Sequence, residues 1–275
     1  MKPKKQRLEN SIEILARQNL GYHEFILKFS DIEEISSLID VRDLDMWRTL
    51  GLDITRNESN EIELGTRFRD ISEQEFCVVD IETTGGTTNG QIIEIGAIKM
   101  KNGTEIGRFE SFVAASAVPE NITELTGIRA SDLVGAPNLL NVLERFKIFL
   151  GTSVFIAHNV NFDYGFISHS LNEIGLGILL NRKLCTIDLS RRTIASQKYG
   201  LGSLKELLGI NNTHHRALND AIAAAEIFKV CLTRLPFSIQ TTEDLISFSK
   251  NAPSVKLKPE PALMSFPSKV SKARR

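Results

Sequence analysis

The stretch FCVVDIET, residues 76–83, decides the fold of this 275-residue chain. It is a run of apolar and β-branched side chains, which predicts a buried strand at the centre of a sheet. QIIEIGAIKM (91–100) and EIGRFESFVA (105–114) follow it, and the pair Asn102-Gly103 between them favours a tight hairpin turn. We therefore expect three antiparallel strands joined by hairpins.

Helical and strand patterns alternate after these three strands. LLNVLERFKIFL (139–150) has helical periodicity, VFIAH (154–158) predicts a short buried strand, and Asn161 is expected to cap the next helix. Further helices are expected around residues 202–208 and over residues 217–235. Strands that are followed by alternating helices and strands predict an α/β fold around one mixed sheet.

Composition and charge divide the chain into three parts. Residues 1–70 carry a net charge of −3, and their pattern predicts a small helical unit that ends in a hairpin. Residues 71–236, with a net charge of −2, form the central domain. Residues 237–275, with a net charge of +4 and half of the chain's eight prolines, predict a helix followed by a flexible basic tail. The first unit allows two interpretations, a DNA-binding winged helix or a packing subdomain; its negative charge favours packing, and the sequence leaves both open.

The composition excludes several classes of protein. The chain has 33 basic and 34 acidic residues, so it lacks the basic excess that is usual in nucleic-acid-binding proteins. Cys77, Cys185 and Cys231 lie far apart, which excludes a disulfide framework and a cysteine zinc site. The sequence shows no secretory signal and no run of 18 apolar residues. We therefore expect a cytoplasmic protein.

Two carboxylates stand out in the first strand of the central domain. Asp80 and Glu82 are two residues apart, so both side chains point to the same face of the strand. Burying two acids on one face is costly unless a positive group neutralises them, and a hard divalent cation with oxygen ligands is a candidate. A solvated strand end is the alternative, and these two residues alone do not decide between them.

Three more residues are candidates because of their positions. Asp163 lies in the first turn of a predicted helix, where the helix dipole by itself would also stabilise an acid. Asp220 borders the small-residue stripe of the last long helix, so it is expected to face the sheet. His215 lies just before that helix, and a solvated loop histidine is its ordinary interpretation.

Together, three motifs carry a family resemblance. DIETTG (80–85), HNVNFD (158–163) and HHRALNDA (214–221) resemble, in order and spacing, the motifs of the DnaQ-like 3′–5′ exonuclease family, DEDDh branch. Within this family the likeness is to the epsilon proofreading subunits of bacterial DNA polymerase III, and it covers about residues 74–236. The resemblance implies a ribonuclease-H-like fold and metal-dependent removal of nucleotides from DNA 3′ ends, in proofreading during replication.

The resemblance also implies roles for the candidate residues. Asp80, Glu82, Asp163 and Asp220 would hold two Mg²⁺ or Mn²⁺ ions, and His215 would take the proton from the attacking water. Four acids and a histidine suit this chemistry, because two such ions stabilise both the attacking and the leaving oxygen. A histidine is also neutral near pH 7, as a general base must be.

Substrate contacts are implied in the same way. Thr83, Thr84 and Gly85 would line the pocket for the terminal nucleotide. ITELTGI (122–128) resembles the segment that lies near the 3′-terminal base in relatives. Phe162, next to the second motif's aspartate, is expected to pack in the core.

The basic tail carries a hypothesis about partners. ALMSF (262–266) places Leu263, Met264 and Phe266 together in a polar stretch, which loosely resembles the pentapeptides that bind the sliding clamp, although the initial glutamine is missing. The family resemblance also implies a DNA polymerase catalytic subunit as a partner. Two alternatives stay open: an RNA exonuclease of the same superfamily, and a non-catalytic tethering module of the replisome.

Overall fold

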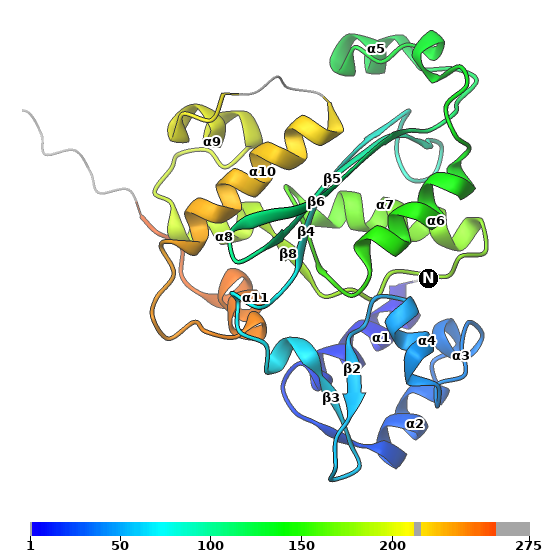
Figure 1. Cartoon of the computed structure of the whole chain (residues 1–275), viewed down its shortest axis with the longest axis vertical. Coiled ribbons are helices and arrows are strands. Elements are labelled where there is room, and N and C mark those ends of the chain that lie inside the picture. The colour runs from blue at the N-terminus through cyan, green and yellow to red at the C-terminus, as the bar shows by residue number, and fades with distance from the viewer. Residues whose placement is uncertain (1, 212–215, 257–275) are drawn as a thin grey trace, which may run out of the picture.

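The strand predicted over residues 76–83 lies at the centre of a five-stranded mixed sheet (Figure 1). The computed structural model describes residues 2–211 and 216–256. The strand order is β6-β5-β4-β7-β8, in which β4 pairs antiparallel with β5 and parallel with β7. The strands of this sheet are β4 (Phe76–Thr83), β5 (Ile92–Lys101), β6 (Thr104–Phe112), β7 (Val154–Ala157) and β8 (Lys183–Cys185).

The expected hairpin unit is confirmed. β4, β5 and β6 pair in antiparallel order, and the turn between β5 and β6 has positive φ angles of 49° at Asn102 and 70° at Gly103. Two consecutive residues with positive φ match the twist of the flanking strands, which is why this residue pair predicts the turn. The predicted α/β fold around one mixed sheet is therefore correct.

Helices cover both faces of the sheet and give the domain two apolar cores. One core lies between the sheet and the helices α6 and α7, and the other between the sheet and the helices α8 to α11 (Figure 1). Alternate residues of β4 face opposite sides, so Cys77 and Val79 contribute to the first core, and Phe76 and Val78 to the second. The helices of this domain are α5 (Glu120–Thr126), α6 (Leu139–Leu150), α7 (Val160–Glu173), α8 (Thr186–Thr193), α9 (Leu201–Leu208), α10 (Ala217–Leu232) and α11 (Thr242–Asn251).

The expected cap of α7 is wrong by two residues. The helix begins at Val160 and its N-cap is Asn159, which has a left-handed backbone with φ 82° and ψ 56°. Asparagine tolerates this conformation better than most residues, so the chain reverses directly after β7. Asn161 therefore lies inside the first helical turn instead of capping it.

The N-terminal unit has its own small sheet and its own core. Its three strands are antiparallel in the order β1-β3-β2, and its core surrounds Trp47, which is fully buried against the rings of Phe25 and Phe29. The predicted helices and hairpin are present, and a DNA-binding role for the unit stays a prediction. Its elements are α1 (Lys2–Leu15), β1 (Leu20–Gly21), α2 (Tyr22–Ser30), α3 (Glu33–Ser36), α4 (Leu44–Thr49), β2 (Ile54–Arg56) and β3 (Glu61–Leu64).

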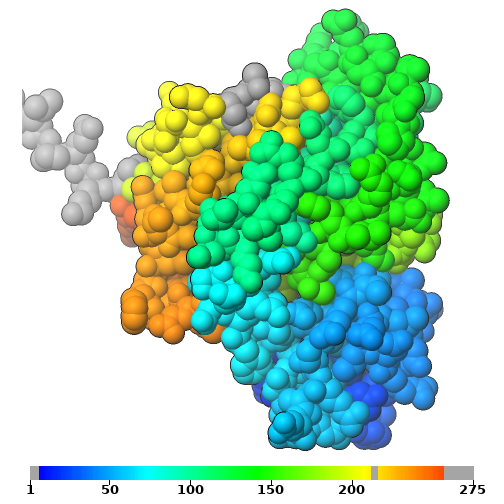
Figure 2. All heavy atoms as spheres, in the orientation of Figure 1, coloured from blue at the N-terminus to red at the C-terminus, as the bar shows by residue number. Residues whose placement is uncertain are grey.

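A buried arginine joins this unit to the larger domain. The Arg182 side chain, 9% exposed, donates to Glu243 in α11 through Nε at 2.7 Å and Nη2 at 2.8 Å, and to Glu13 in α1 through Nη1 at 3.0 Å. Leu180 belongs to the core of the N-terminal unit, and its amide donates to the carbonyl of Leu50. The two parts therefore form a continuous surface, with the N-terminal unit as the lower lobe (Figure 2).

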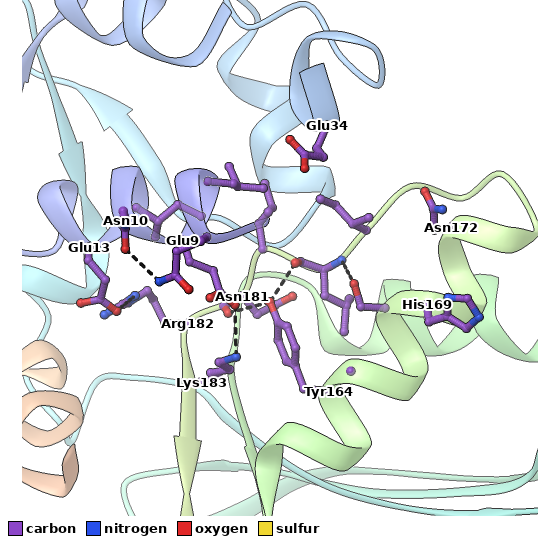
Figure 3. Close-up of a pocket in the computed structure, with 18 of the residues that line it drawn as sticks. Glu9, Asn10, Glu13, Glu34, Tyr164, His169, Asn172, Asn181, Arg182 and Lys183 are labelled. Atoms are coloured by element: carbon purple, nitrogen blue, oxygen red, sulfur yellow. Dashed lines mark hydrogen bonds and ion pairs between the residues drawn. The ribbon is translucent and has the colours of Figure 1, made fainter. Parts of the chain in front are cut away.

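A cavity of about 800 Å³ lies beside this junction, between α1, α3 and α7 (Figure 3). Glu9 and Glu13 approach it from α1, and Tyr164 and His169 from α7. The Tyr164 hydroxyl donates to the carbonyls of Leu179 and Asn181, so it fixes the segment that leads into β8. The cavity is thus lined by residues of both parts of the chain.

Some predicted residues lie outside the described part of the chain. These are His215 and the tail residues Leu263, Met264 and Phe266. Among the helices in the described ranges, none combines the length and the apolar character needed to cross a bilayer.

The Arg182 junction predicts a specific stability change. Glu243→Gln removes the charge that faces a buried guanidinium, so we expect the free energy of unfolding to fall by about 2 kcal/mol. Urea unfolding at pH 7 measures this change. Glu105→Gln is the control, because its pair with Arg108 is exposed and is worth about 1 kcal/mol or less. If the two variants unfold at the same urea concentration, the charge of Glu243 contributes little to the stability of the protein.

Candidate active site

β4 carries Asp80 and Glu82 beyond the point where its parallel neighbour ends. The pairing of β4 with β7 covers Phe76 to Val78, whereas β4 continues to Thr83. Both carboxylates are half-buried, and both lie on the α10 face of the sheet. β4 is also the strand at which the sheet changes from antiparallel to parallel pairing. The carboxyl end of a strand at such a change of order is where α/β sheets commonly bind ligands.

α10 brings Asp220 to the same place. The helix packs closely on β4 and β5 through buried alanines and against Gly96, where a Cβ atom would lie 2.1 Å from the amide nitrogen of Leu218. Any side chain larger than hydrogen at Gly96 would thus push α10 away. As a result, ligand oxygens of Asp80, Glu82 and Asp220 all lie within 4.8 Å of one another. We call these three residues the acid cluster.

Asp163 reaches this place from the opposite face of the sheet. It lies in the first turn of α7 and is 3% exposed. Its Oδ1 atom accepts a hydrogen bond of 3.3 Å from the backbone N–H of Ile81, the residue between Asp80 and Glu82. Asp163 is therefore bound to β4 directly beside the acid cluster. The structure brings together the four predicted acids.

Burial and mutual repulsion govern the charges of these acids. Burial, followed by the charges of Asp163, Glu82 and Asp220, raises the pKa of Asp80 well above its ordinary value. Burial also raises the pKa of Glu82 to about 7 and that of Asp163 to about 8. Carboxylates resist ionisation in such a group unless a cation offsets their charges.

The donor set fits a hard divalent cation. All of the candidate ligand atoms are carboxylate oxygens, which Mg²⁺, Mn²⁺ and Ca²⁺ prefer to nitrogen or sulfur. Asp80, Glu82 and Asp220 are close enough to share one ion, and Asp163 adjoins them. The arrangement can therefore bind cations that in turn hold a phosphate group.

The predicted nucleotide-pocket residues form a tied loop at the end of β4. The Thr83 hydroxyl donates to the carbonyl of Gly85 at 2.9 Å. The Thr84 amide donates to the carbonyl of Gln91, and the Gln91 amide donates back to the Thr84 hydroxyl. Gly90 closes the base of the loop, since a Cβ atom there would lie 2.6 Å from the backbone of Gly85. The loop thus has a fixed base beside the acid cluster.

The motifs contain two histidines that bear on the site, His158 and His215. The Nδ1 atom of His158 lies within hydrogen-bond distance, 2.8 Å, of the Thr186 hydroxyl oxygen. Burial lowers the pKa of His158 to about 4, so its ring is neutral at pH 7. His215, the predicted base, lies outside the described residues, and its role stays a prediction.

Near the site, Phe162 differs from its expected place and one ion pair was not predicted. Phe162 was expected in the core, but its side chain is 42% exposed next to Asp163. Glu94 and Arg216, which were not predicted, form an ion pair of 2.7 Å behind the acid cluster. The signal for Glu94 is an acid in the middle of the apolar run IIEIGAI.

Comparisons with known proteins agree with this geometry. Residues 77–228 match the family model RNase_T, described as exonuclease. The chain is 41% identical over 167 residues to a PolC-type DNA polymerase III of Clostridium perfringens, and 43% identical over 167 residues to that of Caldanaerobacter subterraneus. Each match covers 59% of this chain but 12% of the relative, so the chain corresponds to a small part of those polymerases.

A solved structure supports the fold. Escherichia coli exonuclease I, in a complex with a dA16 oligonucleotide, is similar with a TM-score of 0.52 and 17% identity. The similarity covers 60% of this chain and 42% of that one. This likeness shows a shared architecture, and with the family match it confirms the predicted ribonuclease-H-like fold.

The acid cluster predicts that metal stabilises the protein. Without metal, the folded state holds more protons than the unfolded state between pH 4 and 8, because the pKa values of Glu82 and Asp163 are raised to about 7 and 8. The site's contribution to stability therefore falls as the pH rises through this range. At pH 7.5, Mn²⁺ at 100 times its dissociation constant should add about 2.7 kcal/mol. We expect the melting temperature to rise by about 5 °C or more.

Asp80→Asn tests the origin of this effect. Removing one of the repelling charges should raise the melting temperature in EDTA and abolish most of the rise with Mn²⁺. The melting temperature in EDTA would thus rise while the response to Mn²⁺ falls. General destabilisation would instead lower the melting temperature in EDTA. Differential scanning calorimetry of both proteins measures them, with Glu105→Gln as the control. An unchanged Mn²⁺ response in Asp80→Asn would rule out the cluster as the metal site.

Proposed function

Since this chain belongs to the RNase_T exonuclease family, we propose that it is a metal-dependent 3′–5′ exonuclease of the DEDDh type that removes nucleotides from DNA 3′ ends. The observation that carries the proposal is the acid cluster, with ligand oxygens of Asp80, Glu82 and Asp220 within 4.8 Å and Asp163 adjoining them. Clustered carboxylates at the end of a buried strand have a clear use in phosphodiester hydrolysis, where cations offset the charges of the acids and of the phosphate together.

The proposed roles follow from where each side chain lies. Asp80, Glu82, Asp163 and Asp220 would hold two Mg²⁺ or Mn²⁺ ions. Bound there, the ions would supply charge stabilisation for the attacking and leaving oxygens of the displacement. His215 would accept a proton from the attacking water at a ring nitrogen, as a neutral imidazole can near pH 7.

The surroundings of the acid cluster suit the end of a single strand. The tied loop that carries Thr83, Thr84 and Gly85 lies at the end of β4, where it would line the pocket for the terminal nucleotide. Phe162, which precedes Asp163 in α7, is 42% exposed, and bases stack on exposed aromatic rings without regard to sequence. A 3′ end would thus be held by stacking and by its phosphate, without base-specific contacts.

The relatives favour DNA and a role in proofreading. At 41–43% identity, the matched segment of this chain is similar to part of replicative PolC-type DNA polymerases. A nuclease within such a polymerase would act on primer ends, so we infer that this chain removes misincorporated nucleotides and works with a polymerase catalytic subunit. Binding to the sliding clamp through Leu263, Met264 and Phe266 stays a prediction, since these residues lie outside the described part.

A primer-degradation assay tests the proposed function. With Mg²⁺ or Mn²⁺, the full chain should shorten a 5′-labelled DNA primer from its 3′ end, and a mismatched end faster than a matched one. Asp80→Ala should lower the rate by more than about 100-fold, because even groups that only support metal ligands are worth 10- to 100-fold. Glu105→Gln is the control for unrelated loss of an acid.

The same assay separates the alternatives. An RNA oligomer of matching sequence that is degraded faster than the DNA would identify an RNA exonuclease. No release from any substrate, by a folded protein with both metals, would point to a tethering module. A rate that survives Asp80→Ala would contradict the proposed site.

Phe162 supplies a second test at the substrate side. Stacking of one base on an aromatic ring is worth about 1–3 kcal/mol. Phe162→Ala should therefore raise KM for a single-stranded DNA end by about 5- to 150-fold. Its kcat should change less, since the metal ligands remain. Phe237→Ala is the matched control, because Phe237 is 91% exposed but lies beyond the far end of α10. Similar KM values for both variants would remove Phe162 from the substrate site.

A further inference from the structure

Glu94 is a buried carboxylate for which the proposed reaction has no use. It lies in β5 opposite Glu82 of β4, and it is fully buried. Its neighbours Ile93 and Ile95 are fully buried apolar residues, so an acid in this run is unfavourable unless it is fully satisfied. The partners of Glu94 therefore show what it does.

Both carboxylate oxygens of Glu94 are engaged at the start of α10. Oε1 accepts hydrogen bonds from Arg216, at 3.0 Å from Nε and 2.7 Å from Nη2. Oε2 accepts a bond of 3.1 Å from the backbone N–H of Ala217, the first residue of the helix. A carboxylate at a helix N-terminus is favoured by the helix dipole, and charge-assisted bonds are stronger than neutral ones. Glu94 thus ties β5 to the first turn of α10.

Arg216 is fixed from a second strand. Its guanidinium lies over the ring of Phe112 in β6, 5.0 Å from the ring centroid, and its Nη2 is 3.7 Å from Glu110 of the same strand. Phe112 is the cross-strand partner of Glu94. Arg216 therefore lies across two paired strands, although its side chain is 41% exposed.

This attachment determines where Asp220 lies. The amide of Asp220 donates to the carbonyl of Arg216 at 3.0 Å, so the acid is one helical turn from the tie. Gly96, two residues after Glu94 on the same face of β5, lets the helix approach closely at Leu218. The hydrogen bonds hold the helix end toward the sheet, and the glycine sets how near it comes. Asp220 then meets Asp80 and Glu82.

From this geometry we propose that Glu94 and Arg216 are positioning residues that hold Asp220 in the acid cluster. The effect on metal binding follows from the placement of the helix, and the effect on the reaction rests on the proposed function. The pair also balances charge, because Arg216 faces a carboxylate that would otherwise repel Glu82 from the adjacent strand.

Four variants test the pair in the full chain. Glu94→Gln and Arg216→Gln each remove one charge, the double variant removes both, and Arg216→Lys keeps the charge but loses the two-pronged donor. Glu243→Gln is the matched control, since it breaks a buried arginine–carboxylate pair far from the site, at the junction with the N-terminal unit. The readouts are the Mn²⁺ dissociation constant by calorimetry, the melting temperature in EDTA, and kcat and KM for release of the 3′ nucleotide.

We expect Glu94→Gln and Arg216→Lys to weaken Mn²⁺ binding by about 10- to 100-fold, as supporting groups of metal ligands do. The kcat should fall by a similar factor, with KM for DNA within about twofold of the wild type. Arg216→Gln should be the most harmful single change, because it leaves Glu94 charged and buried without its partner. The double variant should lose less than the product of the two single losses.

Two results would overturn the proposal, and a third would separate it from the proposed function. It is overturned if both Glu94→Gln and Arg216→Lys bind Mn²⁺ within twofold of the wild type. It is also overturned if Glu243→Gln, at a similar melting temperature, weakens Mn²⁺ binding equally, since the loss would then reflect general destabilisation. If the wild-type chain releases no nucleotide, the proposed function fails, and the Mn²⁺ titration still decides whether the pair positions Asp220.

Discussion

Repulsion among buried carboxylates at the end of β4 is the constraint on which the rest of the structure depends. Four acids meet there from a central strand and from helices on both faces of the sheet. Mutual repulsion opposes the proximity of these acids unless a cation offsets it, so each acid must be carried by an element that is fixed elsewhere. The two apolar cores provide this, because they anchor α7 and α10 to opposite faces of the same strand.

The two halves of α10 contribute differently to the stability of the domain and to the placement of Asp220. Its first half is lined with buried alanines, which bury little apolar area but let the backbone approach the sheet. Its second half contributes Ile227, Phe228 and Cys231 to the core, with the Phe228 ring 5.0 Å from that of Phe76. The far half therefore supplies most of the burial energy. The near half carries Asp220, and there the hydrogen bond from the Ala217 amide to Glu94 adds to the packing of Leu218 and the alanines.

Local patterns in the sequence predict much of this fold, and long-range pairings explain the remainder. The apolar run of β4, the turn at Asn102 and the periodicity of α6 are local, so they predict those elements with their bounds. The start of α7 depends on a left-handed residue after β7, which composition does not reveal. The Glu94–Arg216 pair joins residues that are more than a hundred positions apart in the sequence, so no local pattern predicts it. The four acids could be predicted because they lie in sequence motifs that resemble those of a nuclease family.

The near-zero net charge of the chain is the sum over many charges, among them three groups of buried or half-buried charges with different surroundings. In the junction, burial raises the pKa of Glu13 but Arg182 and Lys250 lower it further, to about 2. Behind the acid cluster, Arg216 donates hydrogen bonds of 3.0 and 2.7 Å to the Glu94 carboxylate. In the acid cluster the sign is reversed: the charges that act on Asp80 come from Asp163, Glu82, Asp220 and Glu94, and each raises its pKa. Glu13 and Glu94 thus have an arginine beside them, whereas Asp80 has further acids around it, an arrangement that suits a divalent cation.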